Sequence, residues 1–355
     1  MSLPRATFFV LNAAGLNGFE MTWTSPGAMN AAHGGLWLIV TLWSALLSIA
    51  IATGAFARVS GRDWGWGRTL SVSAIFLAIL VLAGLAAGIA AGQPIRAAGW
   101  NGLAMASASG LLTDAPGVSA PLLWLAAFPI SALAMLGPFV LLDTFTNSRP
   151  PSAVSRLTWA AVAPGFLLAV LLVVAMQALA GSDLLTGAAL RDLTTAGAVA
   201  IDARGAGFVD ATASLSPAAR WALVPVLLVG GASGGVGGGI RAVTLAVVFL
   251  GLLRLLRGRA AGRTFAMATL WLLAMVVLFG LTFLLLVQFS PQLRPDRVAI
   301  LAAAALGGAG VSVDPLTAAG ADAYVMAGAM LLGRVLPWLV LWWSAARGDE
   351  PVAVG

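Results

Sequence analysis

The sequence has no cysteine, no lysine and one histidine among its 355 residues. Without cysteine the chain can form neither a disulfide nor a thiolate metal site. Without lysine it lacks the Gly-Lys step of a Walker phosphate loop and the Schiff base of a retinal pigment. One histidine cannot supply an HExxH zinc site. No acid pair, and no nucleophile with a neighbouring base, lies inside an apolar run, so we expect the protein not to be an enzyme.

Charge is also scarce, since 9% of the residues are charged and 60% are hydrophobic. A chain of this composition cannot bury its apolar surface in a water-soluble core, which predicts an all-α membrane protein. About 20 helical residues cross a bilayer. Seven apolar runs are long enough, at 36–57, 70–91, 122–145, 157–180, 219–256, 265–288 and 322–345.

The distribution of charge predicts the orientation. All nineteen basic residues are arginine, and ten of them follow the first, third and fifth spans or lie in the C-terminal tail. The other face has seven arginines against nine acids. By the positive-inside rule the N-terminus lies outside and the C-terminus in the cytoplasm, in the cell (inner) membrane. Because the net charge of +6 comes largely from the inner loops, we expect no nucleic-acid partner.

The loops on the acidic face contain a repeat, in which a small residue precedes glycine, apolar residues follow it and an acid ends the segment. They read AAGLNGFE, ASGLLTD, GAGFVD and GAGVSVD. Successive glycines are 95, 97 and 103 residues apart, which indicates an internal repeat of about one hundred residues. The glycines are Gly15, Gly110, Gly207 and Gly310, and the residues before them are Ala14, Ser109, Ala206 and Ala309.

Four such loops around one axis would form an ion filter. Glycine allows backbone conformations that turn carbonyl oxygens toward the axis, where they replace the hydration shell of a cation. A ring of carboxylates at the outer mouth would concentrate cations. The alternative for each single loop is an ordinary turn or helix cap. The mouth acids would be Glu20, Asp114, Asp210 and Asp314.

We therefore expect seven transmembrane helices and four re-entrant pore loops, in pseudo-fourfold repeats of helix, pore helix, loop and helix. The first repeat lacks its leading helix and starts with a short pore helix at Ala6–Asn12. The expected divisions are a partial first repeat, a second, a third with a glycine-rich loop, and a fourth with the C-terminal tail, at 1–68, 69–148, 149–263 and 264–355.

The fifth span is too long for one straight helix, because 219–256 would extend about 55 Å. Its middle reads GGASGGVGGGIR, with seven glycines between Gly230 and Gly239. Small-residue helix packing is one interpretation; a non-helical segment that gates the pore is the other. The gate glycines would be Gly230, Gly231, Gly234, Gly235, Gly237, Gly238 and Gly239.

Two arginines fall within or next to apolar spans. Arg334 lies near the middle of the last span, where a charge is costly enough to indicate a paired or functional role. Free carbonyls of the glycine segment are its expected partners. Arg241 follows the glycine run, and it either belongs to the gate or extends its charge to the inner surface.

These motifs resemble the Trk/Ktr/HKT superfamily of potassium transporters, and in particular its TrkH/KtrB-like membrane subunits. The third repeat of that family reads like RTAGF, SLSP and a glycine-rich loop ending in GGGIK; its fourth reads like FGTVGLS and GRVGP. The corresponding segments here are RGAGF at Arg204–Phe208, ASLSP at Ala213–Pro217, GGASGGVGGGIR at Gly230–Arg241, LGGAGVS at Leu306–Ser312 and GRVLP at Gly333–Pro337.

The resemblance implies potassium as the transported ion, bound by the carbonyls of the four glycines, with no organic cofactor. It implies a gate loop contacted by Arg334, a homodimer in membrane lipid, and a cytoplasmic nucleotide-binding regulatory ring of the TrkA/KtrA kind. The threonine that usually precedes each filter glycine is absent. The alternative function is a non-conducting or sodium-selective homologue that acts as a membrane interaction partner.

Overall fold

The structure is a computed structural model, and it describes residues 2–17, 19, 31–62, 64–109, 120–146, 150–180, 215–231, 235–309 and 320–346. These residues form eleven helices and no strand, with one isolated bridge between Val229 and Ile240. The helices are α1 (Leu3–Ala14), α2 (Ala31–Val59), α3 (Trp66–Ala90), α4 (Ile95–Ser107), α5 (Ala120–Phe145), α6 (Ala153–Leu179), α8 (Pro217–Leu228), α9 (Ala242–Leu256), α10 (Arg263–Phe289), α11 (Pro295–Gly307) and α12 (Ala321–Ala346).

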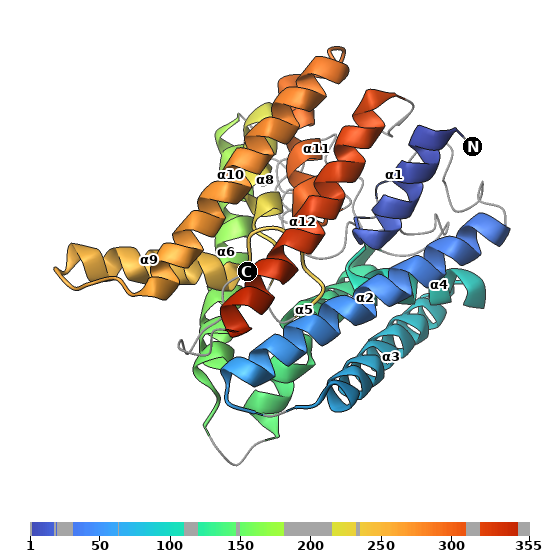
Figure 1. Ribbon diagram of the computed structural model, residues 1–355. Helices are drawn as coiled ribbons and strands as arrows, with labels where there is room; N and C mark the ends of the chain where they lie inside the picture. Colours follow the sequence, from blue (N-terminus) through green and yellow to red (C-terminus); the bar gives the residue numbers. More distant parts are fainter. Residues whose placement is uncertain are drawn as a thin grey trace.

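The long helices confirm an all-α membrane protein. Five of them, α2, α3, α6, α10 and α12, are long and apolar enough to cross a bilayer, and they coincide with five of the seven expected spans. The span expected at 122–145 is α5, which is kinked at Gly137, where φ is 75° and ψ is 161°. The span expected at 219–256 is divided into α8 and α9, and α9 leaves the bundle at a steep angle (Figure 1).

Three short helices, α1, α4 and α11, occupy the positions expected for pore helices. α4 stands between α3 and α5, and α11 stands between α10 and α12, which is the expected order of helix, pore helix and helix. The first pore helix is longer than the predicted stub, because α1 covers twelve residues and Pro4 is suited to its first turn. The pore helix expected in the third repeat falls in 181–214, outside the described residues.

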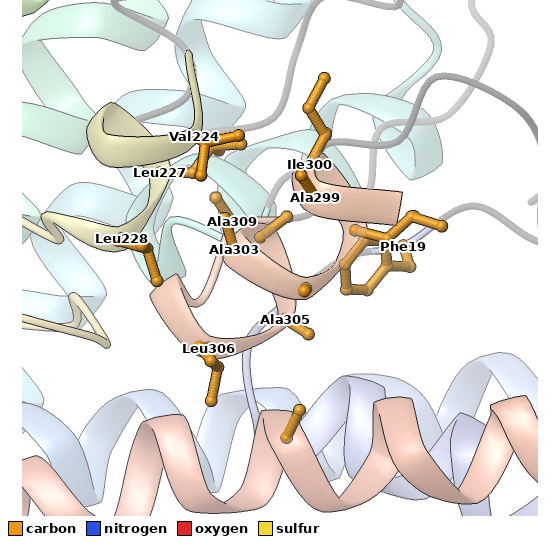
Figure 2. Packing of buried hydrophobic residues seen from close by; sticks show 14 of the residues in the cluster. Phe19, Val224, Leu227, Leu228, Ala299, Ile300, Ala303, Ala305, Leu306 and Ala309 are labelled. Carbon is orange, nitrogen blue, oxygen red and sulfur yellow. The ribbon is translucent and has the colours of Figure 1, made fainter. Parts of the chain in front are cut away.

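The short helix α11 is the centre of the largest buried cluster. Every residue from Val298 to Gly307 is buried, and the helix packs between α8 and α12. Figure 2 shows its alanines facing Leu227 and Leu228 of α8 on one side and Phe19 on another. Small alanine side chains let neighbouring backbones approach closely, as in other membrane helix bundles.

Gly307 makes the closest of these approaches. A Cβ added at Gly307 would lie 1.9 Å from the carbonyl oxygen of Leu227, whereas one added at Gly280 in α10 meets no atom of the described chain within 4 Å. We expect Gly307→Ala to destabilise the protein by about 1–3 kcal/mol through overpacking. Gly280→Ala should be neutral or stabilising, because alanine favours the helix. Thermal unfolding of both variants in detergent tests this; equal melting temperatures would contradict the packing at α8.

Candidate ion pathway

The three described pore helices end in the same way. Each is followed by one residue in the left-handed conformation: Leu16 after α1 with φ of 56°, Ala108 after α4 with φ of 51°, and Gly308 after α11 with φ of 72°. The next backbone amide then turns back to a carbonyl five residues earlier, as in a Schellman motif. These bonds run from Asn17 to Asn12, from Ser109 to Ala104 and from Ala309 to Ala304, each at 3.1 Å.

This common ending defines equivalent positions among the repeats. Asn17, Ser109 and Ala309 occupy the same place after their helices. The next residues in the sequence are Gly18, Gly110 and Gly310. In the first repeat the structure therefore favours Gly18 as the counterpart of the predicted filter glycines. Gly15 lies three residues earlier, at the C-cap of α1, where its φ of −74° is helical.

Most of the predicted filter and mouth residues lie outside the described residues. Gly15, Ala14, Ser109 and Ala309 are described, and they lie at the ends of the pore helices. The predicted positions outside the described part are Gly110, Gly207, Gly310, Ala206, Glu20, Asp114, Asp210, Asp314 and Gly234.

The ends of the pore helices meet near the centre of the bundle. A Cβ at Gly308 would lie 3.8 Å from the carbonyl oxygen of Gly15, and Leu16 and Ala108 share one buried cluster with Val236. The C-terminus of a helix carries about half a negative charge, and this charge attracts cations. Helix C-termini that lie this close together favour a cation near them.

Side chains of the first repeat fix the chain on both sides of Gly18. The Asn12 side chain donates to the carbonyl of Phe19 at 3.1 Å and accepts from the Phe19 amide at 3.0 Å, and both residues are buried. With its amide nitrogen turned toward α11, Asn17 donates to the carbonyls of Ala304 at 3.0 Å and Ala305 at 3.2 Å. These contacts were missed from the sequence, although asparagine is an unusual residue in an apolar pore helix.

The glycine-rich loop between α8 and α9 is fixed by backbone hydrogen bonds to three helices. The amide of Ile240 donates to the carbonyl of Leu228 at 2.9 Å, which closes the loop at its base. The amide of Val236 donates to Ala134 of α5 at 3.3 Å, and the amide of Gly239 to Gly333 of α12 at 3.2 Å. The loop crosses the middle of the bundle (Figure 1). This confirms that the fifth span is broken at its glycines.

Glycine is required where the loop approaches other backbone atoms. A Cβ at Gly235 would lie 1.9 Å from the Ala134 carbonyl oxygen, and one at Gly230 would lie 1.8 Å from the Gly238 carbonyl oxygen. Gly239 has a φ of 68°, which other residues rarely adopt. The loop also touches the end of α11, since a Cβ at Gly238 would lie 3.0 Å from the Gly307 carbonyl oxygen.

Arg334 joins this loop to α2. Its guanidinium donates to the backbone carbonyl of Val236 and to the hydroxyl of Ser48, and the residue is 3% exposed. Its guanidinium carbon also lies 5.4 Å from the centre of the Trp338 ring. The expectation that Arg334 uses free carbonyls of the glycine segment is therefore confirmed, and Ser48 is a partner that the sequence did not reveal.

Arg241 does not extend to the surface. It is 1% exposed and stands at the N-cap of α9, directly after the loop. Of the two alternatives for this residue, extension of its charge to the inner surface is wrong, because the side chain is buried at the start of α9. Two buried arginines therefore follow or contact the glycine-rich loop.

A buried ion pair holds α11 against α8. Arg220 donates to Asp296 at 2.9 Å, and both side chains are less than one-tenth exposed. Arg294 contacts the other carboxylate oxygen at 3.3 Å. Burial alone would raise the pKa of Asp296, but the hydrogen bond from Arg220 and the charges of Arg294 and Arg220 together hold that pKa below its usual value of 3.8.

This pKa predicts a pH dependence. A folded-state pKa below the unfolded-state value means that charged Asp296 stabilises the fold above pH 3.8. That stabilisation is lost as the pH falls below 3.8 through the folded-state pKa. Asp296→Asn should therefore lower the melting temperature at pH 7, and its difference from the parent should shrink at pH values below the folded-state pKa. A difference that stays constant over this range would contradict the assignment.

Fold and site together define the class: a helical membrane protein whose short helices end at one central place above a glycine-rich loop. No family model matches the chain, and no curated protein matches it. The crystal structure of the potassium transporter TrkH from Vibrio parahaemolyticus is similar to this chain, with a TM-score of 0.73 at 16% identity over 99% of this chain and 79% of that one. The chain has a TrkH-like fold.

Proposed function

We propose that this protein moves monovalent cations, and most favourably potassium, across a membrane. The observation that carries the proposal is the ending shared by α1, α4 and α11, because each of these endings is followed directly in the sequence by a glycine of the repeated loops. A crystal structure with this fold is that of a potassium transporter. Backbone carbonyls directed at such a place can replace the hydration shell of potassium.

The filter in this proposal is formed by Gly18, Gly110, Gly207 and Gly310. Gly18 takes the place of Gly15 because Asn17 is equivalent to Ser109 and Ala309. The carboxylates that follow them in the sequence, at Glu20, Asp114, Asp210 and Asp314, raise the local concentration of cations at the outer mouth.

The gate in this proposal is the glycine-rich loop with Arg334. The loop lies against the end of α11, and the guanidinium adds a positive charge on the same side. A buried positive charge repels a cation that leaves the filter. Cations pass when the loop and Arg334 move together. We further propose that a homodimer in the cell membrane, regulated by a cytoplasmic nucleotide-binding ring, is the working form.

Growth of cells that lack potassium uptake tests this function. Expression of the chain should restore growth at low potassium, and a variant with serine at Gly310 should restore it less. A chain that reaches the membrane at normal levels and supports no growth would favour the alternative of a non-conducting homologue.

A further inference from the structure

A cavity opens where α2 ends, α3 begins and α12 approaches its last turns. Its volume is about 500 Å³, and its lining includes Arg58, Arg62, Trp64, Trp66 and Trp342. The end of α2 and the start of α3 lie at the end of the bundle away from α1 and α11 (Figure 1). Two cationic groups and three indole rings around one cavity indicate a ligand with a negative charge beside an apolar part.

The two arginines differ in how their charge is used. Arg62 forms an ion pair with Asp143, whose carboxylate also accepts from the hydroxyl of Ser155 at 2.6 Å. Arg58 lies in the last turn of α2, is exposed, and forms no ion pair with a described residue. Arg62 is therefore held in place as part of the wall, and Arg58 can take an anion.

The tryptophans provide the apolar part of the site. Trp66 of α3 and Trp342 of α12 are stacked, with ring centres 5.5 Å apart and planes at 27°. They remain 55% and 37% exposed, so a broad aromatic surface faces outward beside the arginines. Tryptophan is enriched at the depth where lipid headgroups meet acyl chains.

We propose that this cavity binds the phosphate of an anionic phospholipid. The phosphate lies against Arg58, because a guanidinium forms charge-assisted bonds with phosphate oxygens, and Arg62, which is paired with Asp143, forms the wall beside it. The glycerol and the upper acyl chains lie along Trp66 and Trp342. A free phosphate ion would use the arginines but gain nothing from the tryptophans, so the aromatic wall favours lipid as the source of the phosphate.

A lipid bound at this site also affects the proposed gate. This step rests on the proposed function. The site joins α2 to α12, and these are the two helices that Arg334 connects through Ser48. Along the axis of α12, Trp342 lies about 12 Å beyond Arg334. Along the axis of α2, Arg58 lies about 15 Å beyond Ser48. A lipid that holds these ends together therefore stabilises the arrangement in which Arg334 contacts the loop.

Native mass spectrometry of the full chain in detergent, titrated with phosphatidylglycerol or phosphatidylcholine, tests the binding site. We expect preferential binding of phosphatidylglycerol, and Arg58→Gln should weaken it about tenfold through the loss of one charge-assisted contact. Arg58→Lys should retain most of the affinity, because lysine also binds phosphate. Arg257→Gln is the matched control, since Arg257 is an exposed arginine that follows α9 and lies outside the cavity.

If Arg58→Gln and Arg257→Gln weaken the binding of phosphatidylglycerol equally, the proposed site is wrong. The lipid would then be attracted to basic loops in general. Displacement of the lipid by millimolar inorganic phosphate would overturn the assignment to lipid. Trp342→Leu gives a second measure, and it should lower affinity for phosphatidylglycerol without affecting binding of inorganic phosphate. These measurements contain no ion flux, so they stand or fall separately from the proposed function.

Discussion

Replacing Arg334 by alanine is expected to raise basal cation flux about tenfold, which corresponds to a barrier lower by about 1.4 kcal/mol. The change removes a buried positive charge from the proposed pathway and releases the loop from the contact with the Val236 carbonyl. A charge-assisted hydrogen bond is worth about 1.5–3 kcal/mol, so loss of this contact is large enough to free the loop. Rubidium uptake into liposomes that contain the purified variant measures the effect.

Two further variants separate the charge from the attachment. Arg334→Lys keeps a positive charge but cannot reach Val236 and Ser48 with one planar group, so it should give an intermediate flux. Ser48→Ala removes one acceptor and leaves the contact with Val236, so it should change flux least. Parental flux in Arg334→Ala, with normal elution on size exclusion, would show that the loop is held by packing and is not gated by this arginine.

Serine at a glycine of the proposed filter is the second change with a large expected effect. We expect Gly18→Ser and Gly310→Ser each to lower the preference for potassium over sodium about tenfold, an energetic difference of about 1.4 kcal/mol. The added side chain restricts the backbone conformations that direct carbonyls to the axis, and it crowds the ring that replaces the hydration shell. Competition of potassium and sodium with rubidium uptake gives the preference.

Gly328→Ser is the matched control for these variants. Gly328 lies in α12, and a Cβ added there meets no atom of the described chain within 4 Å. Its selectivity should equal that of the parent. If Gly18→Ser keeps the parental preference while Gly310→Ser loses it, the equivalence drawn from Asn17, Ser109 and Ala309 is wrong.

The sequence was sufficient to predict the helices and the broken span. Long apolar runs located the membrane helices, and the excess of glycine between Gly230 and Gly239 predicted a non-helical segment that the structure contains. The cost of a charge within an apolar span predicted that Arg334 would bind carbonyls. These features depend on composition and local energetics, which are visible without the fold.

The register of the first repeat could not be predicted in this way. Gly15 and Gly18 both follow α1 and both precede Glu20, so spacing alone does not separate them. The choice between Gly15 and Gly18 depends on which backbone amide after α1 donates to a carbonyl five residues earlier. That is set by the three-dimensional structure of the helix end at Leu16 and Asn17. For the same reason the burial of Arg241 depends on the direction of α9, which no local pattern specifies.

Rubidium uptake by the unmodified protein in liposomes tests the central claim most directly. Liposomes that contain the purified protein and are loaded with potassium should take up rubidium as potassium leaves. Potassium added outside should reduce this rubidium uptake more strongly than sodium does. Arg334→Ala should raise the rate of rubidium uptake. Uptake no greater than that of protein-free liposomes, from both the parent and Arg334→Ala with intact folding, would contradict the account of a gated cation pathway.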